Sequence, residues 1–144
     1  MKVAIITDTH FGARNDNLNF NEYFYKFYDN VFFPTLKEKG ITTCIHMGDV
    51  TDRRKYISFK TAYDFRERFV NRFKEMNIDL HITIGNHDTY YKNTSEVNSM
   101  QELIGSDNFK IYTDPEVVEF DGTPILFIPW INSNNYEASM DALE

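Results

Sequence analysis

The sequence predicts an α/β protein with a parallel βαβαβ core and an added antiparallel hairpin. Three short apolar runs, at residues 3–6, 43–47 and 80–84, alternate with two longer segments in which apolar residues recur every three or four positions. This alternation is typical of parallel strands joined by right-handed helical crossovers. Further along, Asp121-Gly122 lies between two more apolar runs and favours a two-residue hairpin turn. The 144 residues fit one domain with a buried core.

The first unit begins with a strand at Val3–Ile6, whose unbroken apolar run indicates burial on both faces. A polar loop is expected at residues 12–19. The helix after it is marked by a stripe of aromatic and apolar residues: Phe20, Tyr23, Phe24, Phe27, Tyr28, Val31 and Phe32. Pro34 should kink or split this helix, because proline lacks the backbone N–H and its ring clashes with the preceding turn. Gly40 should end it.

The second unit repeats this order. A strand at 43–47 precedes a helix whose apolar stripe is Ala62, Phe65, Phe69, Phe73 and Met76. A third strand follows at 80–84, and a short helix is expected from about Ser95 to Gly105.

The last part of the chain is predicted to be different. The hairpin strands are 117–120 and 125–128, and Pro124 fits only near a strand start or at a sheet edge. Residues 139–144 have the pattern of a helix that is beginning. We therefore expect the chain to be the N-terminal part of a longer protein.

The net charge of −7 argues against a general nucleic-acid binder. The charge is unevenly spread, however, since residues 53–74 contain eight bases and two acids while residues 111–144 contain seven acids and no base. The simplest interpretation of the basic stretch is a solvated helix face. Beside a site that handles phosphate, the same stretch would contact a nucleic-acid backbone.

The single cysteine, Cys44, excludes an intramolecular disulfide. It lies in an apolar run, as expected for a small core residue in a reducing compartment. Residues 2–7 reach the polar Asp8 too soon for a signal peptide, and no run of 18 apolar residues exists. The sequence therefore predicts a cytoplasmic protein without a membrane partner.

Each predicted parallel strand is followed by a cluster of polar side chains and glycines. In chain order the clusters are Asp8 and His10, then Gly48, Asp49 and Asp52, then Gly85, Asn86, His87 and Asp88. Crossovers bring the carboxyl ends of parallel strands to one edge of the sheet, where ligands usually bind. The three clusters are therefore expected to converge on one pocket.

The expected pocket offers carboxylates, imidazoles and one amide, without a thiolate. Such donors suit Mn²⁺, Mg²⁺, Fe²⁺ or Zn²⁺ better than soft metals. Asp8 and His10, two residues apart, can turn toward one ion. Asp49 has two oxygens with which to bridge two ions, and Asn86 offers an amide oxygen to the second. Two cations about 3.5–4 Å apart can clamp a phosphoryl group and activate water.

Each cluster alone also has a structural explanation. Asp8 can cap the following turn, and Gly-Asp-x-x-Asp is a weak motif by itself. Gly-Asn-His-Asp is more specific, because a turn needs only one such residue. All three clusters in order, each behind an apolar strand, favour the metal site. His46 and His81 lie inside predicted strands and are interpreted as structural residues.

The motifs resemble those of the calcineurin-like metallophosphoesterases, which are D-x-H, G-D-x-x-[D/H] and G-N-H-[D/E] at three strand ends. Asp8-Thr-His-Phe-Gly12 and Gly-Asn-His-Asp are most similar to the SbcD-type catalytic subunits of nucleases that repair DNA double-strand breaks. The aromatic-rich and Asn-rich composition suggests a phage version, of the kind in T-even recombination endonucleases, located in the host cytoplasm. The resemblance implies a layered α/β/β/α sandwich that is incomplete in this chain, with residues 1–144 as its N-terminal part.

The resemblance also implies a set of metal ligands. Asp8, His10 and Asp49 would hold the first ion. Asp49 and Asn86 would hold the second. Mn²⁺ is the favoured metal, with Mg²⁺, Fe²⁺ and Zn²⁺ as alternatives.

Further roles follow from the same resemblance. His87 would stabilise or protonate the leaving oxygen, and Asp52 would orient His87. Arg53 matches a phosphate-contacting arginine of the phosphatase branch. Asp88 would cap the next turn, tune His87 or contribute weakly to substrate binding.

One departure from the family pattern bears on activity. The family continues with a lone histidine and a Gly-His-x-His motif, yet no histidine follows His87 in this chain. Both ions would lack ligands, so we expect the 144 residues alone to bind metal weakly and to have little nuclease activity.

The whole protein is expected to be a metal-dependent DNA exo- or endonuclease subunit acting in recombination and double-strand-break repair. The resemblance implies an SbcC-type coiled-coil ATPase as its partner, and the helices at 20–32 and 57–76 are candidate homodimer faces. Two alternatives stay open: a phosphatase or small-molecule phosphodiesterase with the same two-metal core, and a non-catalytic scaffold domain. The basic stretch favours DNA whereas the net charge does not, and the intact ligand residues argue against a scaffold.

Overall fold

The computed structural model describes residues 1–92, 94–95, 97–103 and 108–144. Its main feature is a parallel sheet of order β1-β2-β3-β4, whose strands are Ala4–Ile6, Thr43–His46, Asp79–Thr83 and Phe109–Tyr112. A separate antiparallel hairpin pairs β5 (Glu116–Phe120) with β6 (Thr123–Phe127). The predicted parallel core and added hairpin are thereby confirmed.

The fourth strand was not predicted from the sequence. β4 pairs in parallel with β3, and Ile82 lies opposite Ile111. Its four residues include Lys110, so the apolar pattern is too short to distinguish a strand from a loop.

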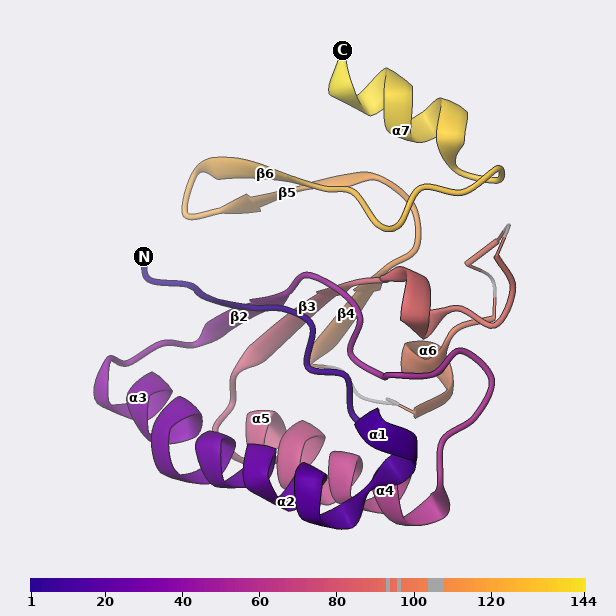
Figure 1. Ribbon diagram of the computed structural model, residues 1–144. Coiled ribbons are helices and arrows are strands. Elements are labelled where there is room, and N and C mark those ends of the chain that lie inside the picture. Colours follow the sequence, from indigo (N-terminus) through magenta and orange to yellow (C-terminus); the bar gives the residue numbers. More distant parts are fainter. Residues whose placement is uncertain (93, 96, 104–107) are drawn as a thin grey trace.

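Two long helical segments cover one face of the sheet, and the hairpin lies on the other (Figure 1). Each segment contains a widened π turn between two α-helical parts. In chain order the parts are α2 (Leu18–Phe27), η1 (Tyr28–Phe32), α3 (Phe33–Glu38), α4 (Phe59–Phe65), η2 (Arg66–Val70) and α5 (Asn71–Glu75). The predicted helices are present, and the second buries Phe65, Phe69 and Phe73 as expected. The stripe predicted for the first helix is only partly correct: Tyr28 and Phe32 are buried, whereas Tyr23, Phe24, Phe27 and Val31 are exposed.

Pro34 marks a change in helical hydrogen bonding rather than a break. The N–H of Phe33 donates to the carbonyl of Tyr28, five residues earlier, just before Pro34 enters the first turn of α3. A π turn contains an extra residue, so it accommodates the missing N–H and the bulk of the proline ring. Gly40, with a φ of 64°, follows the end of the helix as predicted.

The shorter elements differ from prediction in detail. The expected loop at 12–19 contains a turn, α1 (Ala13–Asp16), in which Arg14 and Asn15 have left-handed φ values of 54° and 60°. Helix α6 (Ser99–Leu103) begins after Ser95, and its expected end at Gly105 lies outside the described residues. Helix α7 (Tyr136–Leu143) begins slightly earlier than expected.

The hairpin turn follows the prediction. Asp121 and Gly122 have φ values of 51° and 81°, and two positive values in succession are what a tight hairpin turn requires. Pro124 pairs opposite Glu119 in this two-stranded sheet, where every strand is an edge.

The core has two parts, one on each side of the sheet. Between sheet and helices lies an aromatic cluster centred on Phe69, which contacts the rings of Phe11, Tyr28, Phe33, Phe65 and Phe73. Between sheet and hairpin, Tyr112 stacks on Phe127 with ring centroids 4.2 Å apart. Cys44 is fully buried, and burial raises its thiol pKa to about 12. Among the described residues, no helix is both long and apolar enough to cross a lipid bilayer.

Candidate metal centre

The loops after β1 and β2 are joined by backbone hydrogen bonds beyond the ends of the strands. The N–H of Asp8 donates to the carbonyl of Gly48, and that of His10 donates to the carbonyl of Asp49, both at 3.1 Å. The φ values of Asp8, His10 and Asp49 are 54°, 43° and 53°. Left-handed backbone is strained in such residues, by roughly 1–2 kcal/mol each, and is typically found at functional sites.

The side chains of Asp8, His10 and Asp49 converge at this edge. His10 Nε2 lies 3.4 Å from Asp8 Oδ1 and 3.9 Å from Asp49 Oδ2. One donor atom from each residue lies within 4.8 Å of the other two. Metal–ligand bonds of about 2.0–2.2 Å require separations of this size between donors on a shared ion. The residues and their spacing therefore fit one divalent cation.

Asp8 is held in its charged form. The hydroxyl of Thr7 donates to Asp8 Oδ2 at 2.6 Å, and this bond is the main cause that lowers the pKa of the Asp8 carboxyl. An ionised carboxylate is the form that binds a cation.

The third loop brings Asn86 against the opposite side of Asp49. The amide of Asn86 lies 3.1 Å from both oxygens of Asp49. Turned one way, its nitrogen donates to the carboxylate; turned the other way, its oxygen and the carboxylate can share a cation. The N–H of His87 also donates to Asp49 Oδ1 at 2.9 Å, which fixes the bridging carboxylate between the loops. The predicted second ion therefore has two of its donors side by side.

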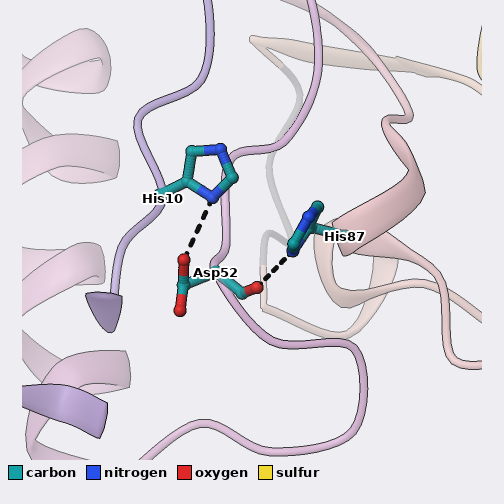
Figure 2. A group of neighbouring side chains, drawn as sticks. All are labelled: His10, Asp52 and His87. Atoms are coloured by element: carbon teal, nitrogen blue, oxygen red, sulfur yellow. Dashed lines mark hydrogen bonds and ion pairs between the residues drawn. The ribbon is translucent and has the colours of Figure 1, made fainter. Parts of the chain in front are cut away.

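A second group, His10, Asp52 and His87, also has donor atoms within 4.8 Å of one another. Figure 2 shows that Asp52 holds both rings with different atoms: its carboxylate faces His10, and its backbone carbonyl faces His87. Asp52 Oδ1 lies 3.1 Å from His10 Nδ1, and the carbonyl accepts a short hydrogen bond from His87 Nδ1. Asp52 therefore contacts both histidines, whereas only a contact with His87 was predicted.

These contacts define the free nitrogen of each ring. Because Nδ1 of His10 is bonded to a carboxylate, Nε2 is left for a cation, which is the usual carboxylate–histidine–metal arrangement. Among the described residues, His87 Nε2 has no hydrogen-bond partner. The two rings lie edge to face with centroids 5.0 Å apart.

Two residues that were predicted to contact substrate weakly have partners within the protein. Asp88 is fully buried, and its carboxylate accepts from the N–H groups of Thr51 and Gly85, each at 3.0 Å. Burial raises its pKa to about 6. A carboxylate without exposed surface cannot reach substrate. Asp88 instead caps its own turn, which is one of the roles predicted for it, and it connects the second loop to the third.

Arg53 is also engaged within the protein. It forms an ion pair with Asp16 and donates to Asn15 Oδ1 at 2.9 Å, so it holds the left-handed turn α1 against the second loop.

His46 is a structural histidine, as predicted, although its pairing with Thr9 was not predicted. The N–H of Gly48 donates to His46 Nδ1 at 3.1 Å, so Nε2 carries the proton and donates to Thr9 Oγ1 at 2.9 Å. Thr9 in turn donates to the carbonyl of Val50 at 3.1 Å. His46 is fully buried, and burial lowers its pKa to about 4. Two features of the sequence indicate this pair: His46 lies two residues before Gly48, and Thr9 lies between Asp8 and His10.

The centre opens onto two hollows. The larger, about 1030 Å³, is lined by Asp8 and His10 together with aromatic residues of α2. The smaller, about 280 Å³, is lined by Asp49, Asn86 and Trp130. The converging donors therefore border a hollow on each of two sides.

Comparison with known proteins agrees with this geometry. The sequence profile of the family described as calcineurin-like phosphoesterase matches residues 1–139. Exonuclease subunit 1 of Enterobacteria phage T4 is 42% identical over 100 residues, which cover 69% of this chain and 29% of that protein. Among solved structures, a protein of unknown function from Aquifex aeolicus has 24% sequence identity to this chain and a TM-score of 0.45. This match covers 86% of this chain and 57% of that protein.

Proposed function

This chain belongs to the calcineurin-like phosphoesterase family, and we propose that it forms the N-terminal part of a metal-dependent nuclease subunit that hydrolyses phosphodiester bonds in DNA. The observation that carries this proposal is the convergence of Asp8, His10, Asp49 and Asn86 from three separate loops. The similarity to a phage exonuclease subunit supports a nuclease over a phosphatase. Recombination and double-strand-break repair are the proposed setting, in the cytoplasm of the host cell.

The proposed cofactors are two divalent cations, with Mn²⁺ favoured. Asp8, His10 and Asp49 would hold one, and Asp49 and Asn86 would hold the other. When bound, such ions neutralise phosphate charge and make water a better nucleophile near neutral pH.

His87 would act on the leaving oxygen. Its Nδ1–H is committed to the carbonyl of Asp52, so the ring has a fixed orientation with Nε2 free. A proton on Nε2 makes the ring cationic. In that form it can offset phosphate charge and donate the proton to the leaving oxygen. Asp52 is thus a positioning residue for His87 through its main chain and for His10 through its carboxylate.

The proposed partners are DNA, an SbcC-type coiled-coil ATPase and a second copy of the chain. Tyr23, Phe27 and Val31 are 71%, 48% and 51% exposed on one helical segment, and this apolar face supports the homodimer. Light scattering of the full-length protein would give twice the monomer mass if the face pairs, and the monomer mass if it does not.

The proposed activity is tested with the full-length protein. We expect Mn²⁺-dependent cleavage of linear duplex DNA that stops when a chelator is added, with little hydrolysis of p-nitrophenyl phosphate. Asn86→Ala should lower kcat on DNA by at least roughly 100-fold, in the range of other single losses of transition-state stabilisation. Asn71→Ala, on α5, is the matched control and should leave kcat unchanged. Hydrolysis of the monoester without cleavage of DNA would instead establish a phosphatase.

A further inference from the structure

A third hollow lies beside the metal centre and has a distinct composition. It measures about 170 Å³ and lies between the loop that follows Asp52 and the residues around Tyr90. Its lining includes Arg53, Arg54, Lys55, Tyr56 and Tyr90, and among the described lining residues none is acidic. Three cations in one small cleft stand out in a chain whose net charge is −7.

We propose, resting on the nuclease function above, that this basic-aromatic cleft binds an unpaired nucleotide of the DNA strand next to the scissile phosphate. Arg54 and Lys55 would contact its phosphate. Tyr90, with Tyr56, would stack on its base.

The charges in the cleft are available for a ligand. Arg53 is neutralised by Asp16, but neither Arg54 nor Lys55 forms an ion pair with any residue the structure describes. A phosphate oxygen is the acceptor that a guanidinium binds best.

The cleft also supplies aromatic faces. Tyr56, Tyr90 and Tyr91 are 72%, 38% and 50% exposed. Lys55 Nζ lies 4.9 Å from the centroid of the Tyr90 ring, so a cation and a ring stand at neighbouring positions. Cationic groups beside exposed rings are the usual composition of single-strand binding surfaces. In a duplex the faces of the bases are covered by their neighbours, so only an unpaired base can stack here.

Hydrogen bonds connect the walls of the cleft to the loops of the metal centre. The N–H of Tyr90 donates to the carbonyl of Val97 at 2.9 Å, and Thr51 Oγ1 lies 3.0 Å from Ser99 Oγ. Arg54 packs over the ring of Trp130 at 5.1 Å. Because Thr51 is next to Asp52, and Tyr90 follows His87 by three residues, the walls of the cleft belong to the loops that carry the centre.

The first experiment measures binding by the full-length protein without catalysis. Fluorescence anisotropy with a labelled 12-nucleotide oligo-dT, in EDTA, should show that Tyr90→Ala weakens binding roughly 5- to 100-fold. Tyr90→Phe should retain wild-type affinity, because it keeps the ring. Lys55→Gln should reduce the slope of log affinity against log salt by about 0.7. Lys37→Gln and Tyr136→Ala, outside the cleft and the basic stretch 53–74, are the matched controls and should bind as wild type.

Comparison with a blunt duplex decides whether the site is for unpaired DNA. We expect Tyr90→Ala to weaken binding to oligo-dT and to leave binding to the duplex almost unchanged. Equal losses on both would overturn the proposal, because they would indicate a general electrostatic surface. Wild-type affinity of Tyr90→Ala and Lys55→Gln for oligo-dT would overturn it as well.

A second measurement separates this proposal from the nuclease function. Bis-p-nitrophenyl phosphate is a diester without a base, so wild type, Tyr90→Ala and Lys55→Gln should hydrolyse it equally with Mn²⁺. If the wild type hydrolyses neither this diester nor DNA, the nuclease function fails and the cleft proposal with it. If the wild type cleaves DNA and Tyr90→Ala cleaves single strands equally well, the cleft proposal alone fails.

Discussion

Asp52 shows how one residue can set the geometry of two histidines. Its carboxylate fixes His10, a proposed metal ligand, and its carbonyl fixes His87, the proposed acid. A substitution of the Asp52 side chain removes the contact with His10 and leaves the main-chain carbonyl that contacts His87. Side-chain variants of Asp52 can therefore test the proposed metal ligand His10 without removing the contact that orients the proposed acid His87.

Asp52→Ala should weaken Mn²⁺ binding roughly 10- to 100-fold, since removal of a carboxylate behind a metal-bound histidine has an effect of this size. Asp52→Asn should have a smaller effect, because its amide oxygen can still accept from His10 Nδ1. Titration calorimetry of the full-length protein measures both. Asp64→Ala, whose carboxylate pairs with Lys60 on α4, is the control. Unchanged affinity in Asp52→Ala would contradict the role assigned to its carboxylate.

His46 should make stability depend on pH. Its pKa is about 4 in the fold, compared with about 6.5 in an unfolded chain. Between these values the unfolded chain binds a proton that the fold does not. This contribution to stability is therefore full above pH 6.5 and is lost as the pH falls toward 4, by on the order of 3 kcal/mol in total.

Urea unfolding at several pH values tests this expectation. His46→Asn should be less stable than wild type at pH 7, because the hydrogen bond to Thr9 Oγ1 is lost. Its stability should fall less than that of wild type as the pH drops from 7 to 5, while Asp88, with its pKa raised to about 6, contributes the opposite dependence in both proteins. Equal pH slopes in the two proteins would show that His46 is not the titrating group.

At the scale of elements, the close approach of two loops explains why glycine occupies position 85. A Cβ there would lie 2.2 Å from Asp49 Oδ1 and 2.3 Å from the backbone nitrogen of Asp49. Real atoms do not approach this closely, so any side chain would push the second and third loops apart. The glycine is therefore part of the geometry that places Asn86 against Asp49.

Gly85→Ala should weaken Mn²⁺ binding at least roughly tenfold and destabilise the fold by about 1–3 kcal/mol, as overpacking does. Gly40→Ala is the control: nothing lies within 4 Å of its Cβ, so only its φ of 64° opposes the change, at a cost of about 1 kcal/mol. Calorimetry and urea unfolding measure the two effects. A Gly85→Ala protein that binds Mn²⁺ like wild type would show that the loops can separate without harm.

The sequence allowed the strand ends to be predicted but not the contacts between loops. Asp8, Asp49 and Asn86 could be placed together because parallel strands end at one sheet edge whatever the details of their packing. The roles of Asp88 and Arg53 depend on how one loop folds over another. Burial and the ion pair with Asp16 decide these roles, and neither has a periodic signal. β4 was missed for a related reason, since its pairing with β3 defines it more than its own four residues do.

At the scale of the whole molecule, the sheet separates two cores of unequal size. The helical side is filled by aromatic rings around Phe69, whereas Ile45, Tyr112, Phe120 and Phe127 make up the buried part of the hairpin side. Ile5 and Met47, of β1 and the loop after β2, are 62% and 60% exposed. Large apolar residues on a sheet are usually covered. This agrees with the proposal that residues 1–144 are part of a larger domain, and the match to 29% of the phage relative supports the same proposal.

The last prediction concerns metal binding by the chain and by the longer protein. Asp8, Asp49 and Asp52 all lie within or beside the centre, where their charges repel one another unless a cation is present. A bound ion should therefore raise the unfolding temperature, since a ligand at 100 times its Kd stabilises a fold by about 2.7 kcal/mol. No histidine follows His87 in the 144 residues. This chain alone should therefore require millimolar Mn²⁺ for a given increase in its unfolding temperature.

Thermal unfolding against Mn²⁺ concentration compares the two proteins directly. The full-length protein should reach the same shift at a concentration at least roughly tenfold lower, because further ligands would complete both sites. Asp49→Asn should abolish the shift in each, since the bridging carboxylate serves both ions, whereas Asp64→Asn should leave it unchanged. Tight binding by the 144-residue chain would mean that Asp8, His10, Asp49 and Asn86 are sufficient for the ions. The absent histidines would then belong to catalysis and not to metal binding.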